Sequence, residues 1–476
     1  MSSEQKIDYS KTLEKYRSYS QEHVLSRWSN LSTEQRRTLL QQLSNVDLEL
    51  IQNLVEKYIL NGLQKTETEV KFSPPEVISI PQTHEELEIA KTAVQYGEGI
   101  IRSGKVGLVL VAGGQGTRLG FPGPKGKYPM TPIKNKSLFQ IHAEKILALS
   151  RRYQTNLPWY IMTSESNDDE TKSFFAENSY FGLNQSDIFF FQQNMIPGVN
   201  ESGKLLLQSQ HRIFTNPDGH GGTLGALRNS GALKDMADRG LEQLYYFQVD
   251  NVLLKICDPV FVGYHTKANS DMSCKIVQKK NPEEKVGVVG YSNEKLTVIE
   301  YSDLPKELKF ARNEDGSLIY GAGNIAVHML AHSFIEKLTN GSLSLPFHLA
   351  HKKIPYLNES GEKINPDEPN GYKFETFIFD ALQYAANPVV MEVNRKEEFS
   401  PVKNTNGDNS KLTANQAMCN LFGSWFEKAG FDVPRDTATG NVLGKVEISP
   451  LYALDENEFV NKAHSELQYN DGLYLG

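Results

Sequence analysis

The run VGLVLV, from Val106 to Val111, restricts the possible folds of this chain more than any other segment. A strand made only of apolar residues is buried on both faces, as strands of a parallel sheet are. Similar short runs begin at Pro158 (PWYIM), Ile188 (IFFFQ) and Tyr245 (YYFQV), and segments of helical length lie between them. This alternation predicts an α/β fold with a mixed, mostly parallel sheet of the Rossmann-like kind.

The strands come closer together after about Ser273, in SCKIVQKK, VGVVG and TVIEY. Such crowding leaves no room for crossover helices, so we expect an antiparallel region added to the sheet. The first hundred residues instead follow helical periodicity, with capping-box patterns at Ser32–Gln35 and Thr83–Glu86. The proline-rich stretch KFSPPEVISIPQ, from Lys71, reads as a linker between helices.

A chain of 476 residues is too long for one compact core. We therefore expect three domains: a helical N-terminal domain over 1–102, a Rossmann-like domain over 103–403, and a small C-terminal domain with β structure over 404–476. The last range carries turn-rich sequence, one amphipathic helix near Cys419 to Phe426 and strand-like pieces such as KVEISPLYAL.

Composition excludes several classes of function. The net charge of −8 argues against a nucleic-acid partner, because such proteins carry a basic surface. Cys257, Cys274 and Cys419 lie far apart and form no CxxC pair, so we expect buried reduced thiols rather than disulfides or a zinc site. The polar N-terminus has no signal-peptide core, and no segment reaches the roughly 18 apolar residues of a membrane helix. These features predict a cytoplasmic protein with no membrane partner.

The glycine-rich stretch GGQGTRLG, from Gly113, follows the first buried strand directly. Glycines let backbone amides approach phosphate oxygens, and several N–H groups in one tight loop form an anion-binding concavity. Arg118 and Lys125 add cationic donors. The stretch is not a Walker loop, because Gly126–Lys127 is followed by Tyr128, and it is not a dinucleotide fingerprint, because Leu119 takes the place of the third glycine.

The loop closely resembles the GxGTRLG and downstream PK signature of the UDP-sugar pyrophosphorylases. The rest of the chain, from about Trp28 onward, resembles the eukaryotic members that act on N-acetylglucosamine. Matching stretches include SLFQIHAEK at Ser137, PDGHGG at Pro217, VDNVL at Val249, GAGNIAVH at Gly321, PNGYKFETFIFD at Pro369 and EFSPVKN at Glu398. The resemblance implies a nucleotidyltransferase that converts UTP and N-acetylglucosamine 1-phosphate into UDP-N-acetylglucosamine and pyrophosphate.

The same resemblance implies roles for individual residues. Arg118, Lys125 and Lys403 would neutralise the reacting phosphates. The UTP-binding set would be Val111, Ala112, Gly113, Gly114, Gly116, Thr117, Lys125, Gln193, Gly219, Asp250 and Lys373. Asp250 ends the run YYFQV and would hold Mg²⁺, a hard cation that prefers oxygen ligands; on its residue pattern alone it could equally cap the following helix. Lys373 and Lys403, taken alone, could be solvated surface lysines.

Sugar recognition would fall on His220, Gly287, Glu300, Tyr301, Asn324, Phe377, Phe379 and Lys403. Phe377 and Phe379 are two residues apart, so we expect them on one face of an extended segment, either beside the N-acetyl group or in the core. His220 stands where the family usually has asparagine, and near pH 6.5 its charge could change. A second departure, EISPLYALDEN near Glu447, lies far from the expected chemistry and should concern only the terminal domain.

Three other functions remain open at this stage. The sugar could be GalNAc, glucose or another hexose 1-phosphate. A glycosyltransferase could share the α/β plan, but such enzymes use an acid-x-acid metal pair, whereas Asn251 and Val252 follow Asp250. A non-catalytic UDP-sugar sensor could keep the loop, although the retained Arg118, Lys125, Asp250, Lys373 and Lys403 argue against lost chemistry.

Overall fold

The computed structural model describes residues 8–61, 71–341, 345–464 and 467–476. The chain divides into two compact units, which we describe separately. Unit 1 comprises Met1–Glu69, Asn194–Thr223 and Leu345–Ile378. Unit 2 comprises Val70–Gln193, Leu224–Ser344 and Phe379–Gly476.

A mixed sheet forms the centre of unit 2. Its parallel part follows the order β10-β2-β3-β4, with bounds β2 Val106–Val111, β3 Trp159–Thr163, β4 Ile188–Gln192 and β10 Gln243–Gln248. The four apolar runs form these strands, and β3 is buried throughout. The predicted α/β fold is confirmed.

The crowded strands after Ser273 form the expected antiparallel region. Strand β14 pairs antiparallel with β10, β11 and β12, while β19 adds a parallel edge to β11. The bounds here are β1 Phe72–Ser73, β11 Met272–Gln278, β12 Val288–Ser292, β13 Lys295–Ile299, β14 Ala322–Ala331 and β19 Val390–Glu392.

Helices pack around this sheet, and several of them share one hydrophobic core with it. Two of them, α4 and α9, cross closely because Gly97 and Gly263 carry no side chain; a Cβ at either position would lie 1.9 Å from a carbonyl oxygen of the other helix. The capping box predicted at Thr83–Glu86 begins α4. The helices are α4 His84–Arg102, α5 Leu138–Tyr153, α6 Asp168–Glu177, α7 Thr223–Asn229, α8 Ala232–Asp238, α9 Pro259–Lys267, α10 Lys306–Lys309, α11 His332–Thr339, α12 Arg395–Glu398, α13 Lys411–Lys428 and α14 Glu456–Lys462.

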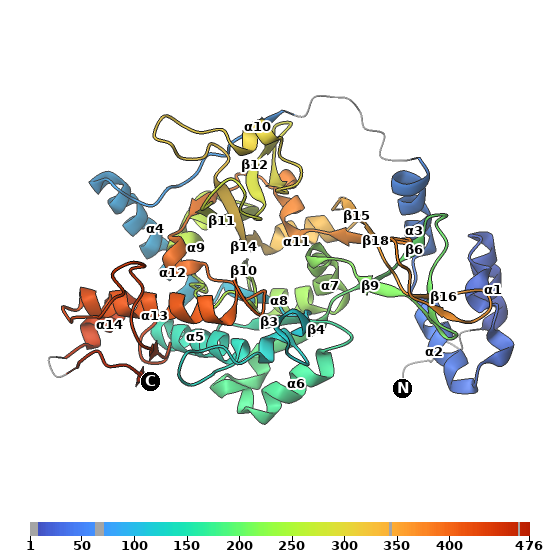
Figure 1. Ribbon diagram of the computed structural model, residues 1–476, viewed down its shortest axis with the longest axis horizontal. Coiled ribbons are helices and arrows are strands. Elements are labelled where there is room, and N and C mark those ends of the chain that lie inside the picture. Colours follow the sequence, from blue (N-terminus) through green and yellow to red (C-terminus); the bar gives the residue numbers. More distant parts are fainter. Residues whose placement is uncertain (1–7, 62–70, 342–344, 465–466) are drawn as a thin grey trace. The chain divides into compact units, whose positions relative to one another are not determined.

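Unit 1 combines helices from the N-terminus with strands from two later parts of the chain (Figure 1). Helices α1 Tyr9–Ser18, α2 Thr33–Ser44 and α3 Leu48–Val55 bury Tyr16, Leu39 and Ile51 in one core with Val199 and Phe374. The capping box at Ser32–Gln35 begins α2 as predicted. The strands are β5 Met195–Pro197, β6 Val199–Asn200, β7 Leu207–Ser209, β8 Arg212–Ile213, β9 Thr215–Pro217, β15 Phe347–Lys352, β16 Tyr356–Leu357, β17 Lys363–Ile364 and β18 Gly371–Thr376.

This division differs from the three consecutive ranges expected from the sequence. The N-terminal helices share a core with residues 194–223 and 345–378, which are distant in the chain. At the other end, α13 and strands β20 Val446–Ile448 and β21 Leu473–Leu475 belong to unit 2, and Phe426 and Phe459 lie in the same core as the central sheet. Hydrophobic burial between sequence-distant segments leaves no local signal, so consecutive boundaries could not anticipate it.

The segment around Glu447 also reaches further than expected. Its buried Oε2 accepts hydrogen bonds of 2.8 Å from the backbone N–H groups of Ile133 and Lys134. Ser449 donates to Glu144 of α5. This departure therefore concerns the loop that leads from the glycine-rich stretch into α5, and not only the chain terminus.

The three cysteines are buried and form no disulfide, as predicted. Within the described residues, the helices are all too short or too polar to cross a membrane.

Candidate active site

The glycine-rich stretch forms a tight, folded-back loop after β2. Gly116 N–H donates to the carbonyl of Gly123 at 2.9 Å, and Lys125 N–H donates to the carbonyl of Gly114 at 3.0 Å. A Cβ on Gly116 would lie 2.9 Å from Phe121, whereas Gly114 has open space around it. The turn therefore excludes a side chain at Gly116, while Gly114, Thr117 and Arg118 face outward and are exposed. Exposed backbone and a guanidinium on one tight loop suit a phosphate group.

Asn167 fixes the start of this loop from the neighbouring strand's carboxyl end. Its Nδ2 donates to the carbonyl of Ala112 at 3.0 Å, and it lies 3.5 Å from that of Gly114. The side chain is 1% exposed. Sequence reasoning missed this residue, although its place just after β3 is the signal that could have found it.

Lys125 and Asp250 of unit 2 form an ion pair that is largely buried. Lys125 Nζ lies 2.8 Å from Asp250 Oδ2, and the two side chains are 17% and 10% exposed. Burial alone would raise the pKa of Asp250, but the charges of Lys125 and Lys403 outweigh it and hold the pKa below its ordinary value. The carboxylate is therefore ionised at neutral pH. Asp250 follows β10, and the next helix begins only at Pro259, so Asp250 is not a helix cap.

Residues from three parallel strands meet at one edge of the sheet. Gln193 follows β4, and its Oε1 lies 3.0 Å from where a Cβ on Gly113 would stand. The loop follows β2 and Asp250 follows β10. Carboxyl ends of parallel strands form the ligand crevice of doubly wound sheets. Lys403 is exposed, and two residues later Thr405 donates to the carbonyl of Arg118 at 2.9 Å, which ties this segment to the loop.

Gly287, Glu300 and Asn324 lie together in the antiparallel region. Asn324 N–H donates to the carbonyl of Gly287 at 2.9 Å, and Glu300 Oε1 lies 3.5 Å from the place of a Cβ on Gly287. Asn324 Oδ1 accepts the N–H of Ala326, whose φ of 56° is unusual for alanine. The amide oxygen is thus engaged within the strand, which leaves the NH₂ group as the part Asn324 can offer to a hydroxyl. Tyr301 follows in a turn and is 40% exposed.

The PDGHGG turn lies in unit 1 and packs on the end of β18. Gly219 has a φ of 86°, and a Cβ there would lie 2.3 Å from the carbonyl oxygen of Thr376. Glycine is therefore required at this position. Lys373, on β18, places its ammonium 5.2 Å from the centre of the Phe214 ring.

His220 stacks on Phe377, with ring centres 5.2 Å apart and an angle of 30° between planes. Its Nδ1 accepts the N–H of Ile378 at 3.1 Å, so the ring is neutral in this arrangement. Burial and the neighbouring His348 lower the pKa of His220 to about 4. The expectation of a charge change near pH 6.5 is therefore wrong, because a protonated Nδ1 could not accept this bond.

We expect the same pH profile of kcat/KM in the wild type and in a His220→Asn variant between pH 6 and 8, apart from a constant factor. His220 is neutral throughout this range, so its titration contributes no inflection. Initial rates with the sugar phosphate as the varied substrate measure this. An inflection near pH 6.5 that disappears in the variant would contradict the neutral state.

Phe377 and Phe379 do not share one face of an extended segment. The strand β18 ends at Thr376, and the chain enters a 3₁₀ helix at Ile378–Tyr384. Phe377 is half-buried in unit 1 beside the two histidines, while Phe379 is 6% exposed in unit 2. The two-residue spacing implied one face only for as long as the backbone stayed extended.

Comparison with known proteins supports one family. Residues 48–459 match the family described as UTP–glucose-1-phosphate uridylyltransferase. A UDP-N-acetylhexosamine pyrophosphorylase-like protein 1 of Xenopus tropicalis is 38% identical over 89% of this chain and 88% of its own length. The UDP-N-acetylglucosamine pyrophosphorylase of Saccharomyces cerevisiae is 36% identical over 86% of this chain and 89% of its own length.

Solved structures agree with this assignment. The crystal structure of the uridine diphosphate N-acetylglucosamine pyrophosphorylase of Trypanosoma brucei, in complex with an inhibitor, superposes with a TM-score of 0.81 at 25% identity. The match covers 98% of both chains.

Proposed function

Because the chain belongs to the UTP–glucose-1-phosphate uridylyltransferase family, we propose that it transfers UMP from UTP to N-acetylglucosamine 1-phosphate. The products are UDP-N-acetylglucosamine and pyrophosphate. The observation that carries this proposal is the Lys125–Asp250 pair, 2.8 Å apart, beside the glycine-rich loop at the carboxyl edge of β2 and β10.

The chemistry is a single displacement at phosphorus. A phosphate oxygen of the sugar 1-phosphate attacks the α-phosphorus of UTP, a new P–O bond forms, and the bond from the α-phosphorus to the oxygen of pyrophosphate breaks. Two anions must meet, so the protein's main contributions are positioning and charge neutralisation. Arg118 and Lys125 would neutralise the leaving pyrophosphate, and Lys403 the attacking phosphate.

The nucleotide would lie along the loop from Val111 to Thr117. Backbone N–H groups at the exposed Gly114 suit phosphate oxygens. The carboxamide of Gln193 offers both a donor and an acceptor, which suits the edge of a uracil ring, and its closeness to Gly113 supports that place for the base. Gly219 and Lys373 lie in unit 1, and their contacts with the nucleotide stay predictions from the resemblance.

Asp250 would hold Mg²⁺, which supplies additional charge neutralisation when bound. Within the described residues no group of three or more His, Cys, Asp or Glu side chains could hold a metal by itself. A single ionised carboxylate nevertheless suits Mg²⁺, because this ion is commonly held by one or two carboxylates together with substrate phosphates. The low pKa of Asp250 keeps that ligand charged.

The sugar would be recognised by a donor and an acceptor on two residues, Asn324 and Glu300, that both lie beside Gly287. The NH₂ group of Asn324 can donate to a sugar hydroxyl, the carboxylate of Glu300 can accept from one, and Gly287 allows a close approach. We propose that Tyr301 and Phe379 of the same unit contribute further contacts, while the sugar contacts of His220 and Phe377, in unit 1, stay predictions from the resemblance. The three buried cysteines, which form no disulfide, are consistent with a reducing compartment, and we propose the cytoplasm.

A panel of sugar phosphates tests the proposal. Pyrophosphate release with UTP and Mg²⁺ is measured for GlcNAc-1-P, GalNAc-1-P and Glc-1-P. We expect the highest kcat/KM with GlcNAc-1-P. A preference for GalNAc-1-P would change the assigned substrate to another N-acetylhexosamine phosphate, the wider class in the name of the Xenopus relative. A preference for Glc-1-P would overturn the substrate assignment. Tight UDP-GlcNAc binding without turnover would indicate a sensor.

We expect an Asp250→Asn variant to need at least about tenfold more Mg²⁺ for half-maximal activity, with a lower maximal rate. Asparagine keeps the size of the side chain but loses the negative charge that attracts the cation. A Mg²⁺ titration of initial rates at saturating UTP measures this. An unchanged Mg²⁺ dependence would place the metal elsewhere. An Asp271→Asn variant serves as a control, because this carboxylate lies just before β11 begins and accepts the N–H of Ala386.

A further inference from the structure

The segment that carries Asp250 is paired with the segment that leads to Lys403. Asn251 and Pro401 form an antiparallel bridge, and Val402 N–H donates to the carbonyl of Asp250 at 3.0 Å. Lys403 is the next residue. The backbone positions of the two groups are therefore set by one short pairing.

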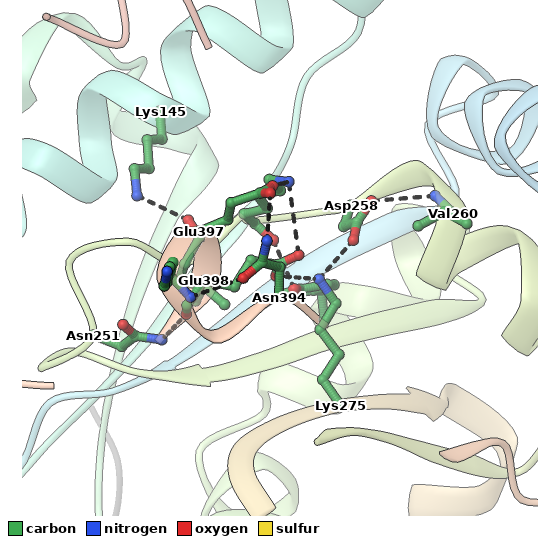
Figure 2. A network of polar contacts seen from close by, with 12 residues as sticks. Lys145, Asn251, Asp258, Val260, Lys275, Asn394, Glu397 and Glu398 are labelled. Carbon is green, nitrogen blue, oxygen red and sulfur yellow. Dashed lines mark hydrogen bonds and ion pairs between the residues drawn. The ribbon is translucent and has the colours of Figure 1, made fainter. Parts of the chain in front are cut away.

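The side chain of Asn251 holds this pairing together. Its Nδ2 donates to the carbonyl of Glu398 at 2.6 Å (Figure 2). Its Oδ1 accepts the N–H of Ser400 at 3.0 Å. The residue is 4% exposed. A carboxamide offers a donor and an acceptor side by side without depending on pH, so Asn251 fits the 398–400 turn in a way that leucine or an ionised aspartate cannot.

Both paired segments, the one with Glu398 and the one with Asp250, are also held by side chains of neighbouring elements. Lys275 is fully buried and places its ammonium 2.6 Å from both Glu398 Oε2 and Asp258 Oδ2 (Figure 2). On the other segment, two side chains of α5 form hydrogen bonds to backbone carbonyl groups. His142 Nε2 bonds to the carbonyl of Val249 at 3.0 Å, and Lys145 Nζ donates to the carbonyls of Val252 and Leu254 at 2.7 and 2.8 Å. Asn251 thus links two chain segments that are each held in place by buried side chains of other elements.

We propose that Asn251 is a positioning residue for the transfer reaction, which fixes the base of Lys403 relative to Asp250. The proposal rests on the function proposed above. Lys403 is exposed, and a lysine side chain is long and flexible, so the place of its ammonium depends on where its backbone starts. A displacement of about 1 Å in a positioned group can cost about 10²-fold in rate.

A double-mutant cycle tests the proposal. Asn251→Ala, Lys403→Ala and the double variant are compared in kcat and in KM for each substrate. We expect Asn251→Ala to lower kcat/KM for GlcNAc-1-P by roughly 30- to 100-fold, with the KM for UTP changed less than about twofold. We expect the double variant to match Lys403→Ala, because a group that acts through Lys403 has no effect once that ammonium is gone.

Asn394→Ala is the matched control. Asn394 belongs to the same polar network, where it caps α12 and donates to Glu397 at 2.8 Å (Figure 2). Its bond to the paired segment runs from Glu398 N–H to its own backbone carbonyl at 3.0 Å, which alanine keeps. We expect its effect to multiply with that of Lys403→Ala. If Asn251→Ala also multiplies with Lys403→Ala, Asn251 is only structural and the proposal is overturned.

An Asn251→Asp variant gives a second, independent readout. The aspartate keeps the acceptor for Ser400 N–H but can donate to the Glu398 carbonyl only when it is protonated. Its kcat/KM for GlcNAc-1-P at pH 8 should therefore fall at least as far as that of Asn251→Ala, and an unchanged value would contradict the role of the donor. If the wild type itself shows no uridylyl transfer, the proposed function fails; if it turns over and the cycle is multiplicative, only the positioning role fails.

Discussion

Replacing Lys125 by alanine should lower kcat/KM for uridylyl transfer by about 10³-fold or more while the protein remains folded. Removing one preorganised group that faces developing charge costs about 10²- to 10³-fold in comparable sites. Here the loss also leaves Asp250 without its nearest cation, 2.8 Å away, so the pKa of that carboxyl should rise. Pyrophosphate release at saturating Mg²⁺ and circular dichroism together measure the two parts of this expectation.

Lys127→Ala is the control for this experiment. Lys127 lies in the same short 3₁₀ turn, Lys125–Lys127, but its ammonium faces Glu170 at 2.6 Å rather than Asp250. An ion pair of this partly exposed kind contributes at most about 1 kcal/mol. We expect its kcat/KM to stay within about threefold of the wild type. Equal losses in both variants would mean that the turn as a whole matters and would remove the specific role of Lys125.

The sequence anticipated the parts of the structure that depend on local pattern. Short apolar runs became β2, β3, β4 and β10, because a strand buried on both faces has no polar positions to alternate. The loop was expected directly after the first buried strand and Asp250 at the end of the YYFQV run, and both lie at one edge of the sheet because parallel strands end on the same side. The assignment of individual contacts to UTP and sugar came from resemblance and stays a prediction.

What could not be anticipated depends on contacts between distant segments. The N-terminal helices share a core with residues near Val199 and Phe374, so consecutive domain boundaries missed unit 1. The neutral state of His220 depends on Ile378 N–H and on burial, neither of which is visible in PDGHGG. In the sequence, Asn251 indicates only that no second metal-binding acid follows Asp250. In the structure, its two hydrogen bonds to residues 398 and 400 hold two distant segments together.

The second large effect is expected at Lys275, and it concerns stability. A Lys275→Met variant should lose about 3–5 kcal/mol of unfolding free energy at pH 7, because it leaves buried carboxylates without their cation. The side chain is 0% exposed and lies 2.6 Å from both Asp258 and Glu398. Trp159 and Trp425 both lie in unit 2, so urea unfolding followed by tryptophan fluorescence in a Trp28→Phe background reports on this unit.

The pH dependence of this loss identifies its cause. Burial already raises the pKa of Glu398, and Lys275 is the strongest influence that lowers it. Without Lys275 the pKa of Glu398 in the folded state should rise further above its unfolded value of about 4. A raised carboxyl pKa favours folding at low pH and is unfavourable once the pH exceeds it, so the deficit should shrink as the pH falls from 7 to 5.

Lys255→Met, at a lysine 43% exposed beside Glu397, should cost less than about 1 kcal/mol. A deficit in Lys275→Met that is equally small, or that does not change with pH, would show that the cluster is not held by this buried cation.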